Sequence, residues 1–338
     1  MAKFTILGAG AWGTALGLHL ASRGHDVVLV PRTPTQADAM DAARENSIHF
    51  PGFSFPKNLR TDSSFAALLS SDAVFLACAT AGVLEFCRRI REATLGFSRL
   101  PPLITLCKGL VPESLQFPTV AIQSLLPQFE IGVLSGPTHA GDVALGKPTA
   151  AVIATAMDRE RACRLQAWIS SPSFRVYRTA DVTGVELGGA LKNPYAIGLG
   201  IAEKFAGSDN GWAALLTRMV AELARIGVSL GGQRETFYGL SGLGDLIATG
   251  NGRWSRNRTF GERIARGEKP EAILSDGKLT VEGYGATKGF HELCRRKKIP
   301  APVLGGIYGI LYEDRPPEDI RSALMGRSLR EEMDGPSP

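Results

Sequence analysis

The sequence predicts an α/β fold: an amino-terminal doubly wound parallel sheet of the Rossmann-like kind, then a mostly α-helical carboxyl-terminal domain. Short apolar runs alternate with helical patterns through the first half of the chain, as βαβ units require. A glycine-rich turn, GAGAWG, follows the first run, and long helical periods replace the alternation after Thr179. We expect a first domain over residues 1–184, a second over 185–330 and a flexible tail over 331–338.

The first half contains six predicted strands, each a short run rich in apolar residues. They are Lys3–Leu7, Asp26–Val30, Ala73–Cys78, Leu103–Cys107, Gly132–Ser135 and Ala150–Ala154. Helical patterns between them cover Gly13–Arg23, Ser63–Ser70 and Gly82–Thr94. In an open sheet of this kind, ligands bind beyond the carboxyl ends of the strands.

The second half contains longer helical patterns. They cover Val185–Lys204, Asn210–Gly227, Phe260–Ala265, Tyr284–Lys297 and Val303–Tyr312. The dense basic run at 295–298 falls at the end of one of them, where cations stabilise a helix terminus. We therefore interpret it as a solvated helix end, and we expect no nucleic-acid partner even though the net charge is +5 and the pI near 9.0.

Composition narrows the class of protein. The chain has 338 residues, of which 44% are hydrophobic, and its apolar runs are too short to span a membrane. We expect no signal peptide, no membrane insertion and a cytoplasmic location. The five cysteines are scattered without a CxxC pair, and the five histidines show no ligand spacing, so we expect reduced thiols and no metal ion.

The GAGAWG turn predicts a dinucleotide site because it lies between a strand and a helix inside a complete βαβ unit. Gly8 would make the tight turn, Gly10 would let the backbone approach a pyrophosphate, and Gly13 would allow close helix packing. Ala11 and Trp12 begin the helix whose free N–H groups would face the phosphates. Alternatively, the turn holds no ligand and Trp12 only packs.

Arg32 follows the second predicted strand, where an NAD-selective site usually places an acidic residue. Its guanidinium suits the 2′-phosphate of NADP, so we expect the chain to use NADP or NAD with NADPH preferred. Alternatively, Arg32 stacks on the adenine and both cofactors serve.

The segment ELGGALKN (186–193) places Lys192 inside a long apolar helical run. Burying an ammonium costs several kcal/mol unless it is paired, so a buried lysine indicates a use such as proton transfer beside a nicotinamide. Gly188 and Gly189 would leave room for ligand, and Asn193 could bind a substrate oxygen. Alternatively, Lys192 reaches solvent from the helix edge.

Two further stretches carry polar groups. SGLGDLIATG puts Asp245 among glycines and apolar residues, where its carboxylate needs a buried partner, a ligand hydroxyl or a helix N-cap. WSRNRTFG supplies Ser255, Arg256, Asn257 and Arg258 in a row, a set that suits a phosphate but also fits a surface loop.

Together these motifs resemble the bacterial-type NAD(P)-dependent glycerol-3-phosphate dehydrogenase family. GAGAWGTAL, CKGL, LSGPTHA, VELGGALKN, GLGDL, SRNRTFG and VEG cover nearly the whole length. The resemblance implies reduction of dihydroxyacetone phosphate to sn-glycerol 3-phosphate for phospholipid synthesis, a small phosphorylated substrate, and Lys192 as proton donor or acceptor. The nearest alternatives are a β-hydroxyacid or ketopantoate-type reductase and a non-catalytic nucleotide sensor. The apolar helices make a homodimer our expectation.

The resemblance also implies roles for single residues. Substrate would be bound by Lys108, Gly136, Thr138, Lys192, Asp245, Ser255, Arg256 and Asn257. The cofactor would contact Lys108, Ala140, Arg256 and Glu282, besides the GAGAWG turn. The chain departs from the family pattern at Cys107, His139 and Thr280 and in the stretch 79–82, with effects that the sequence leaves open.

Overall fold

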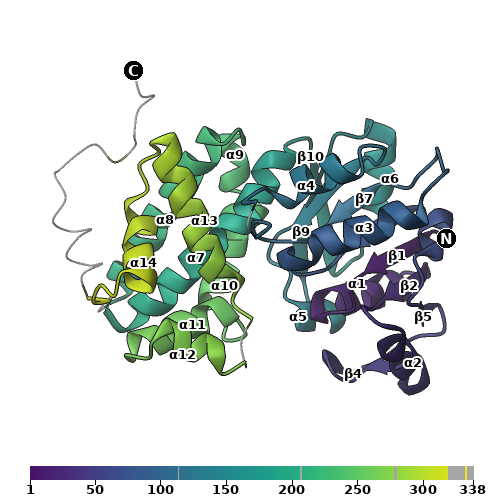
Figure 1. Ribbon diagram of the computed structural model, residues 1–338, viewed down its shortest axis with the longest axis horizontal. Coiled ribbons are helices and arrows are strands. Elements are labelled where there is room, and N and C mark those ends of the chain that lie inside the picture. The colour runs from purple at the N-terminus through teal and green to yellow at the C-terminus, as the bar shows by residue number, and fades with distance from the viewer. Residues whose placement is uncertain (113, 206–207, 278–279, 319–331, 333–338) are drawn as a thin grey trace.

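The computed structural model describes residues 1–112, 114–205, 208–277, 280–318 and 332 (Figure 1). A sheet-containing half and a helical half lie side by side, joined through α7 (Val182–Phe205). The α/β class is confirmed. The predicted tail, 331–338, lies outside the described residues except for Glu332.

The sheet has eight strands within the described residues, in the order β10-β9-β8-β7-β6-β1-β2-β5. Their bounds are β1 (Lys3–Leu7), β2 (Asp26–Val30), β5 (Leu59–Thr61), β6 (Ala73–Leu76), β7 (Leu103–Thr105), β8 (Ile131–Ser135), β9 (Thr149–Thr155) and β10 (Phe174–Thr179). Neighbouring strands from β5 to β8 run parallel, whereas β9 is antiparallel to β8 and parallel to β10. The sheet is therefore mostly parallel, as predicted.

Helices cover both faces of the sheet, which explains why β6 is buried along its whole length. On one face α1 (Ala11–Ser22) and α6 (Arg159–Ile169) contribute Leu16 and Leu165 to a shared core. On the other, α3 (Val83–Ala93) and α4 (Pro118–Leu125) contribute Phe86 and Ile122. Shorter helices α2 (Pro34–Ala43) and α5 (Ala140–Ala144), and the hairpin of β3 (Glu45–Asn46) and β4 (Phe50–Ser54), complete this half.

The predicted strands agree with the structure better than the predicted connections do. The first two strands are confirmed to the residue, and the other four differ by one or two residues at their ends. Strands β5 and β10 were not predicted. β5 has only three residues, and β10 (FRVYRT) alternates buried Phe174 and Val176 with exposed Arg175 and Tyr177, so it shows no continuous apolar run. The helix expected at Ser63–Ser70 was wrong in type: only a short 3₁₀ helix, Ala66–Ser70, forms there.

Helix α7 is the axis of the helical half. It begins after Asp181, whose carboxylate Oδ1 accepts the Gly184 N–H at 2.8 Å as an N-cap does. Around it lie α8 (Asp209–Ser229), α9 (Arg234–Phe237), the π-turn η3 (Leu240–Gly244), α10 (Asp245–Asn251), α11 (Arg256–Ala265), α12 (Pro270–Ser275), α13 (Glu282–Lys297) and α14 (Pro302–Tyr312). The close approach of α11 requires Gly200, where a Cβ would lie 2.2 Å from the Arg258 carbonyl oxygen.

The five helices predicted in this half are confirmed, with ends that differ by up to four residues. The basic run 295–298 does close α13, where Glu292 pairs with Arg295 and Arg296. Among the described helices, none combines the length and the hydropathy that a transmembrane span requires.

Candidate active site

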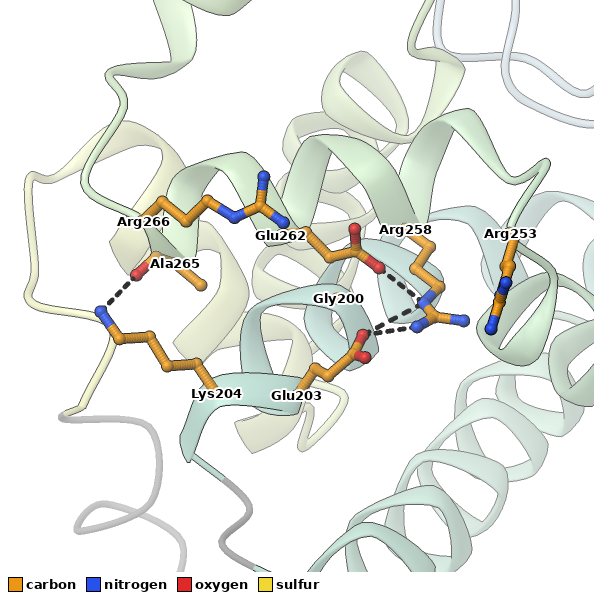
Figure 2. A pocket seen from close by; sticks show the side chains of 8 residues that line it. All are labelled: Gly200, Glu203, Lys204, Arg253, Arg258, Glu262, Ala265 and Arg266. Carbon is orange, nitrogen blue, oxygen red and sulfur yellow. Dashed lines mark hydrogen bonds and ion pairs between the residues drawn. The ribbon is translucent and has the colours of Figure 1, made fainter.

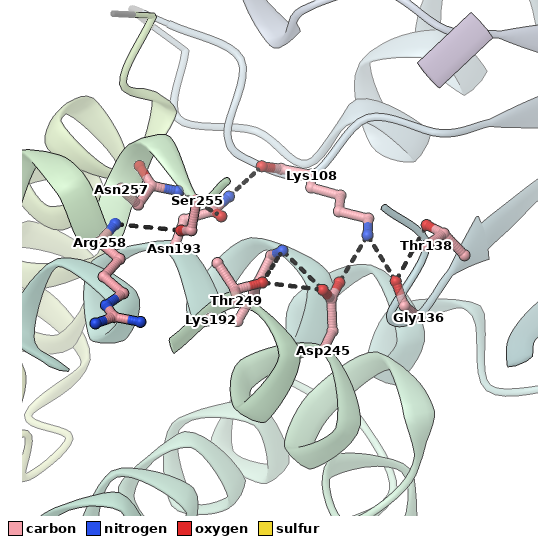
Figure 3. Close-up of polar contacts among 10 residues, drawn as sticks. All are labelled: Lys108, Gly136, Thr138, Lys192, Asn193, Asp245, Thr249, Ser255, Asn257 and Arg258. Atoms are coloured by element: carbon pink, nitrogen blue, oxygen red, sulfur yellow. Dashed lines mark hydrogen bonds and ion pairs between the residues drawn. The ribbon is translucent and has the colours of Figure 1, made fainter. Parts of the chain in front are cut away.

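Lys192 lies in the buried interior of α7, with 6% of its surface exposed. Its ammonium Nζ donates to Asp245 Oδ1 at 2.8 Å and to Thr249 Oγ1 at 2.7 Å (Figure 3). The alternative in which this lysine reaches solvent is excluded. The apolar helix does hold a paired, buried cation.

Asp245 links this lysine to the sheet half. It is the first residue of α10 and is 1% exposed, and its Oδ2 accepts from Lys108 Nζ at 2.7 Å (Figure 3). Lys108 follows β7 and donates a second hydrogen bond to the Gly136 carbonyl oxygen, just beyond β8, at 2.8 Å. The carboxyl ends of two strands therefore meet the centre of α7 through one shared carboxylate.

Burial and charge shift the ionisation of this cluster. Burial lowers the pKa of Lys192 to about 8, against the raising effect of Asp245, and nearby Lys108 lowers it further. Burial alone would raise the pKa of Asp245, but the two lysine ammoniums outweigh it and hold that pKa below its usual value. A lysine whose pKa lies near neutrality can both give and take a proton.

Sequence reasoning missed Thr249. Its hydroxyl accepts from Lys192 and lies 3.2 Å from Asp245 Oδ1, and the residue is 2% exposed. The available signal was its position four residues after Asp245, on the same face of a helix.

Three predicted roles near Lys192 need correction. A Cβ on Gly188 would lie 3.0 Å from the Ser241 backbone, and one on Gly189 would lie 2.7 Å from Ser135 Oγ, so these glycines admit protein and not ligand. Asn193 is 3% exposed and donates to the Lys108 carbonyl oxygen at 2.7 Å while its own oxygen accepts from Asn257. Both ends of its side-chain amide are therefore occupied by protein partners, so Asn193 supports the site and does not bind substrate.

The SRNR segment does not converge on one ligand. Ser255 caps α11 by accepting the Arg258 N–H, and Asn257 accepts the Gly283 N–H at 3.1 Å. Arg258 turns away to pair with Glu203 and Glu262, so it does not share a ligand with Arg256. Arg256 is exposed and forms no hydrogen bond or ion pair with the described residues, which leaves its guanidinium available to a ligand.

Arg258 instead enters a separate pocket of about 440 Å³ between α7 and α11 (Figure 2). There it pairs with Glu203 and Glu262 (Figure 2). Lys204, at the end of α7, donates to the Ala265 carbonyl oxygen at the end of α11. Because a cation at a helix carboxyl end stabilises the helix, Lys204 stabilises the ends of α7 and α11, while Arg258 is held by its two glutamates.

The GAGAWG turn has the geometry of a phosphate cradle. Gly8 has φ +112°, and a Cβ there would lie 2.5 Å from the Ala77 carbonyl oxygen; a Cβ on Gly13 would lie 2.1 Å from the Gly8 oxygen. A Cβ on Gly10 would meet nothing within 4 Å, so open space lies before the start of α1. The Trp12 indole N–H is buried without a partner among the described residues. These observations fit a bound dinucleotide.

The remaining predicted residues lie around the same edge of the sheet. Ala11 is exposed at the first position of α1, and Arg32 is exposed just after β2. Thr138 is partly buried and donates to the Gly136 oxygen, and Ala140 begins α5. Glu282 begins α13, and burial raises its pKa against the effects of Arg256 and the Thr80 N–H.

Two of the departures from the family pattern, His139 and Cys107, have contacts in the structure. His139 stacks on Trp254 with 4.3 Å between ring centroids, which joins the loop after β8 to the loop before α11. Cys107 Sγ donates to the Cys78 carbonyl oxygen at 3.1 Å, and all five cysteines are free. Among the described residues, no cluster of three or more potential ligands could hold a metal ion.

Comparisons with known proteins give a consistent result. The family described as NAD-dependent glycerol-3-phosphate dehydrogenase matches with its N-terminal part at residues 3–161 and its C-terminal part at 181–322. Glycerol-3-phosphate dehydrogenase (NAD(P)+) of Thiobacillus denitrificans is 40% identical over 333 residues, covering 98% of this chain and 100% of the relative. The enzyme of the same name from Thermus thermophilus is 39% identical over 333 residues, with the same coverage.

Solved structures agree. A glycerol-3-phosphate dehydrogenase from Coxiella burnetii superposes with a TM-score of 0.88 at 31% identity, over 96% of this chain and 99% of that one. A ketopantoate reductase from Ralstonia eutropha reaches a TM-score of 0.58 at 17% identity, over 95% and 99% of the two chains, and shares the fold alone.

Proposed function

The chain belongs to the NAD-dependent glycerol-3-phosphate dehydrogenase family, and from this premise we propose how its residues catalyse the reaction. The protein is an oxidoreductase that interconverts dihydroxyacetone phosphate and sn-glycerol 3-phosphate with NAD(P)H. The observation that carries the mechanism is the buried Lys192, whose pKa of about 8 lies within the working range of an enzyme. The sn-glycerol 3-phosphate that the enzyme makes supplies phospholipid synthesis.

Lys192 is the general acid of ketone reduction. A bound reduced nicotinamide supplies the hydride for C2 of the substrate. Lys192 gives a proton to the C2 oxygen as negative charge develops there, and takes it back in the reverse direction. Asp245 and Thr249 hold the ammonium by hydrogen bonds of 2.8 and 2.7 Å, which fixes the direction of its third N–H.

The substrate is held from both halves of the protein. Arg256, exposed and without a hydrogen bond or ion pair among the described residues, binds the phosphate by its guanidinium fork. Ser255 and Asn257 set the first turn of the helix that carries it, Ser255 by capping that helix and Asn257 by accepting the Gly283 N–H, and thereby position Arg256 for the substrate. Lys108, Gly136, Thr138 and Asp245 hold the other end of the substrate.

The turn Gly8–Gly13 would hold a dinucleotide: Gly10 and Ala11 would receive its pyrophosphate, and Trp12, Ala140 and Glu282 would contact the rest of it. Lys108 and Arg256 would contact both cofactor and substrate. Arg32, exposed just after β2, would bind the 2′-phosphate of NADP, so we propose that NADPH is preferred over NADH. We propose that the enzyme works in the cytoplasm. We also propose that it is a homodimer, and light scattering during size-exclusion chromatography would test this oligomeric state.

The decisive experiment follows the absorbance of NADPH and of NADH with dihydroxyacetone phosphate and, separately, with ketopantoate. We expect rapid oxidation with dihydroxyacetone phosphate, faster with NADPH. Turnover of ketopantoate alone would favour the related reductases, and nucleotide binding without any turnover would favour a sensor.

A further inference from the structure

Glu186 opens the ELGGALKN segment and has no part in the chemistry above. It lies on α7, with 3% of its surface exposed. Its Oε1 accepts the backbone N–H of Thr119 at 2.9 Å, and its Oε2 accepts the Thr119 hydroxyl. These two bonds join residues that are 67 positions apart in the chain.

Thr119 belongs to the sheet half. It is the second residue of α4, which packs against α3 and β8. The residue before this helix, Phe117, provides no side-chain cap, so the first N–H groups of α4 need an acceptor from elsewhere. Glu186 supplies that acceptor from the helical half, at the positive end of the helix dipole.

Glu186 and Lys192 lie on the same helix, six residues or about 9 Å apart at 1.5 Å per residue. We propose that Glu186 is a positioning residue, whose bonds to Thr119 fix α7 against the sheet half and thereby set Lys192 relative to Lys108 and the bound reactants. This inference rests on the proposed role of Lys192. A displacement of only 1 Å in a reacting geometry can cost about a hundredfold in rate.

The contact between Glu186 and Thr119 has a measurable consequence for the pKa of Lys192. Three charged groups act on Lys192: Asp245 on α10 and Glu282 on α13 raise its pKa, and Lys108 beyond β7 lowers it. Of these, only Lys108 belongs to the sheet half. If α7 moves away from that half, the effect of Lys108 weakens and the pKa of Lys192 rises.

The helical half contains a matched control. Glu222 on α8 is also buried and also accepts the first free N–H groups of a helix, those of Val303 and Leu304, together with the Tyr195 hydroxyl at 3.1 Å. All its partners lie in the helical half. Tyr195→Phe therefore removes one hydroxyl from a buried glutamate within the helical half. Thr119→Val makes the same kind of change at the contact between the two halves.

The experiment measures kcat against pH, with saturating dihydroxyacetone phosphate and NADPH, for Glu186→Met, Glu186→Gln, Thr119→Val and Tyr195→Phe. We expect Glu186→Met to lower kcat about 10- to 100-fold. We also expect the fall in kcat that reports the pKa of Lys192 to move to higher pH. Glu186→Gln keeps one acceptor, and the Thr119 hydroxyl can turn to accept from its amide, so most of kcat returns. Thr119→Val lowers kcat less than Glu186→Met does, and the two together are no worse than Glu186→Met alone.

The inference would be overturned if Glu186→Met and Thr119→Val fold and both keep the wild-type kcat and the wild-type dependence of kcat on pH. The same upward shift in Tyr195→Phe would also overturn it, by showing general loosening. If Glu186→Met does not fold, Thr119→Val decides. Lys192→Ala in the same assay tests the proposed function separately: a normal rate there defeats the mechanism itself, whereas an inactive Lys192→Ala beside normal Glu186 variants defeats only the positioning role.

Discussion

Asp245→Asn tests whether the buried carboxylate sets the proton affinity of Lys192. Asparagine has nearly the same shape, so the change removes charge and leaves packing intact. Burial and Lys108 both lower the pKa of Lys192, and Asp245 opposes them most strongly, with a net value of about 8. Without the carboxylate we expect the pKa to fall by about 1–3 units, the usual effect of one charge within 4–6 Å.

The consequence for rate can be worked out. Ketone reduction needs protonated Lys192, so its kcat is high below the pKa and falls as pH rises through about 8. Oxidation of glycerol 3-phosphate needs the neutral amine, so its kcat rises over the same interval. A fall in pKa from 8 to 6 would cut the protonated fraction at pH 7.5 from about 76% to about 3%, a loss of about 25-fold in reduction.

The assay is kcat against pH in both directions, at saturating substrate so that weaker substrate binding does not interfere. Asp158→Asn is the control, since Asp158 is an exposed N-cap of α6 that asparagine also satisfies. We expect the limb of Asp245→Asn to move to lower pH in both directions. A limb that stays near 8, or moves upward, would refute the assignment of that pKa to the Lys192–Asp245 pair.

Four further variants test the rest of the site. Lys192→Ala should lower kcat about 10²- to 10⁴-fold, the range for losing a general acid, with the Kd for NADPH unchanged in a fluorescence titration. Thr249→Val should lower kcat about tenfold by removing one acceptor of the ammonium; a normal kcat would make the hydroxyl dispensable. Gly10→Ala should keep the wild-type Tm but raise the KM for NADPH, because its methyl group enters open space, whereas a lower Tm would place protein there. Arg32→Asp should turn the kcat/KM ratio toward NADH, and an unchanged ratio would remove Arg32 from cofactor selection.

The local parts of the site could be predicted because their signals are local. The GAGAWG turn lies within one βαβ unit, and the cost of burying a lysine marks Lys192 within one helix. The partners of that lysine could not be predicted from spacing. Asp245 is 53 positions from Lys192 and 137 from Lys108, and only the packing of α10 between α7 and the sheet edge brings them together.

The errors have the same origin. The four polar residues 255–258 suit one phosphate when only their sequence is considered, but the start of α11 sends successive side chains in different directions, so Arg258 reaches Glu203 instead of the site. Gly188 and Gly189 were interpreted as space for ligand, when the close approach of η3 and β8 to α7 takes that space. A glycine in the sequence indicates that something lies close to its backbone, but it does not indicate whether that neighbour is ligand or protein.

A crystal structure with NADP+ and dihydroxyacetone phosphate both bound tests the central claim most directly, through the distance from Lys192 Nζ to the C2 oxygen. We predict about 3 Å, within hydrogen-bond reach, with the Asp245 and Thr249 contacts retained. A C2 oxygen that contacts another donor while Lys192 remains out of reach would contradict this mechanism.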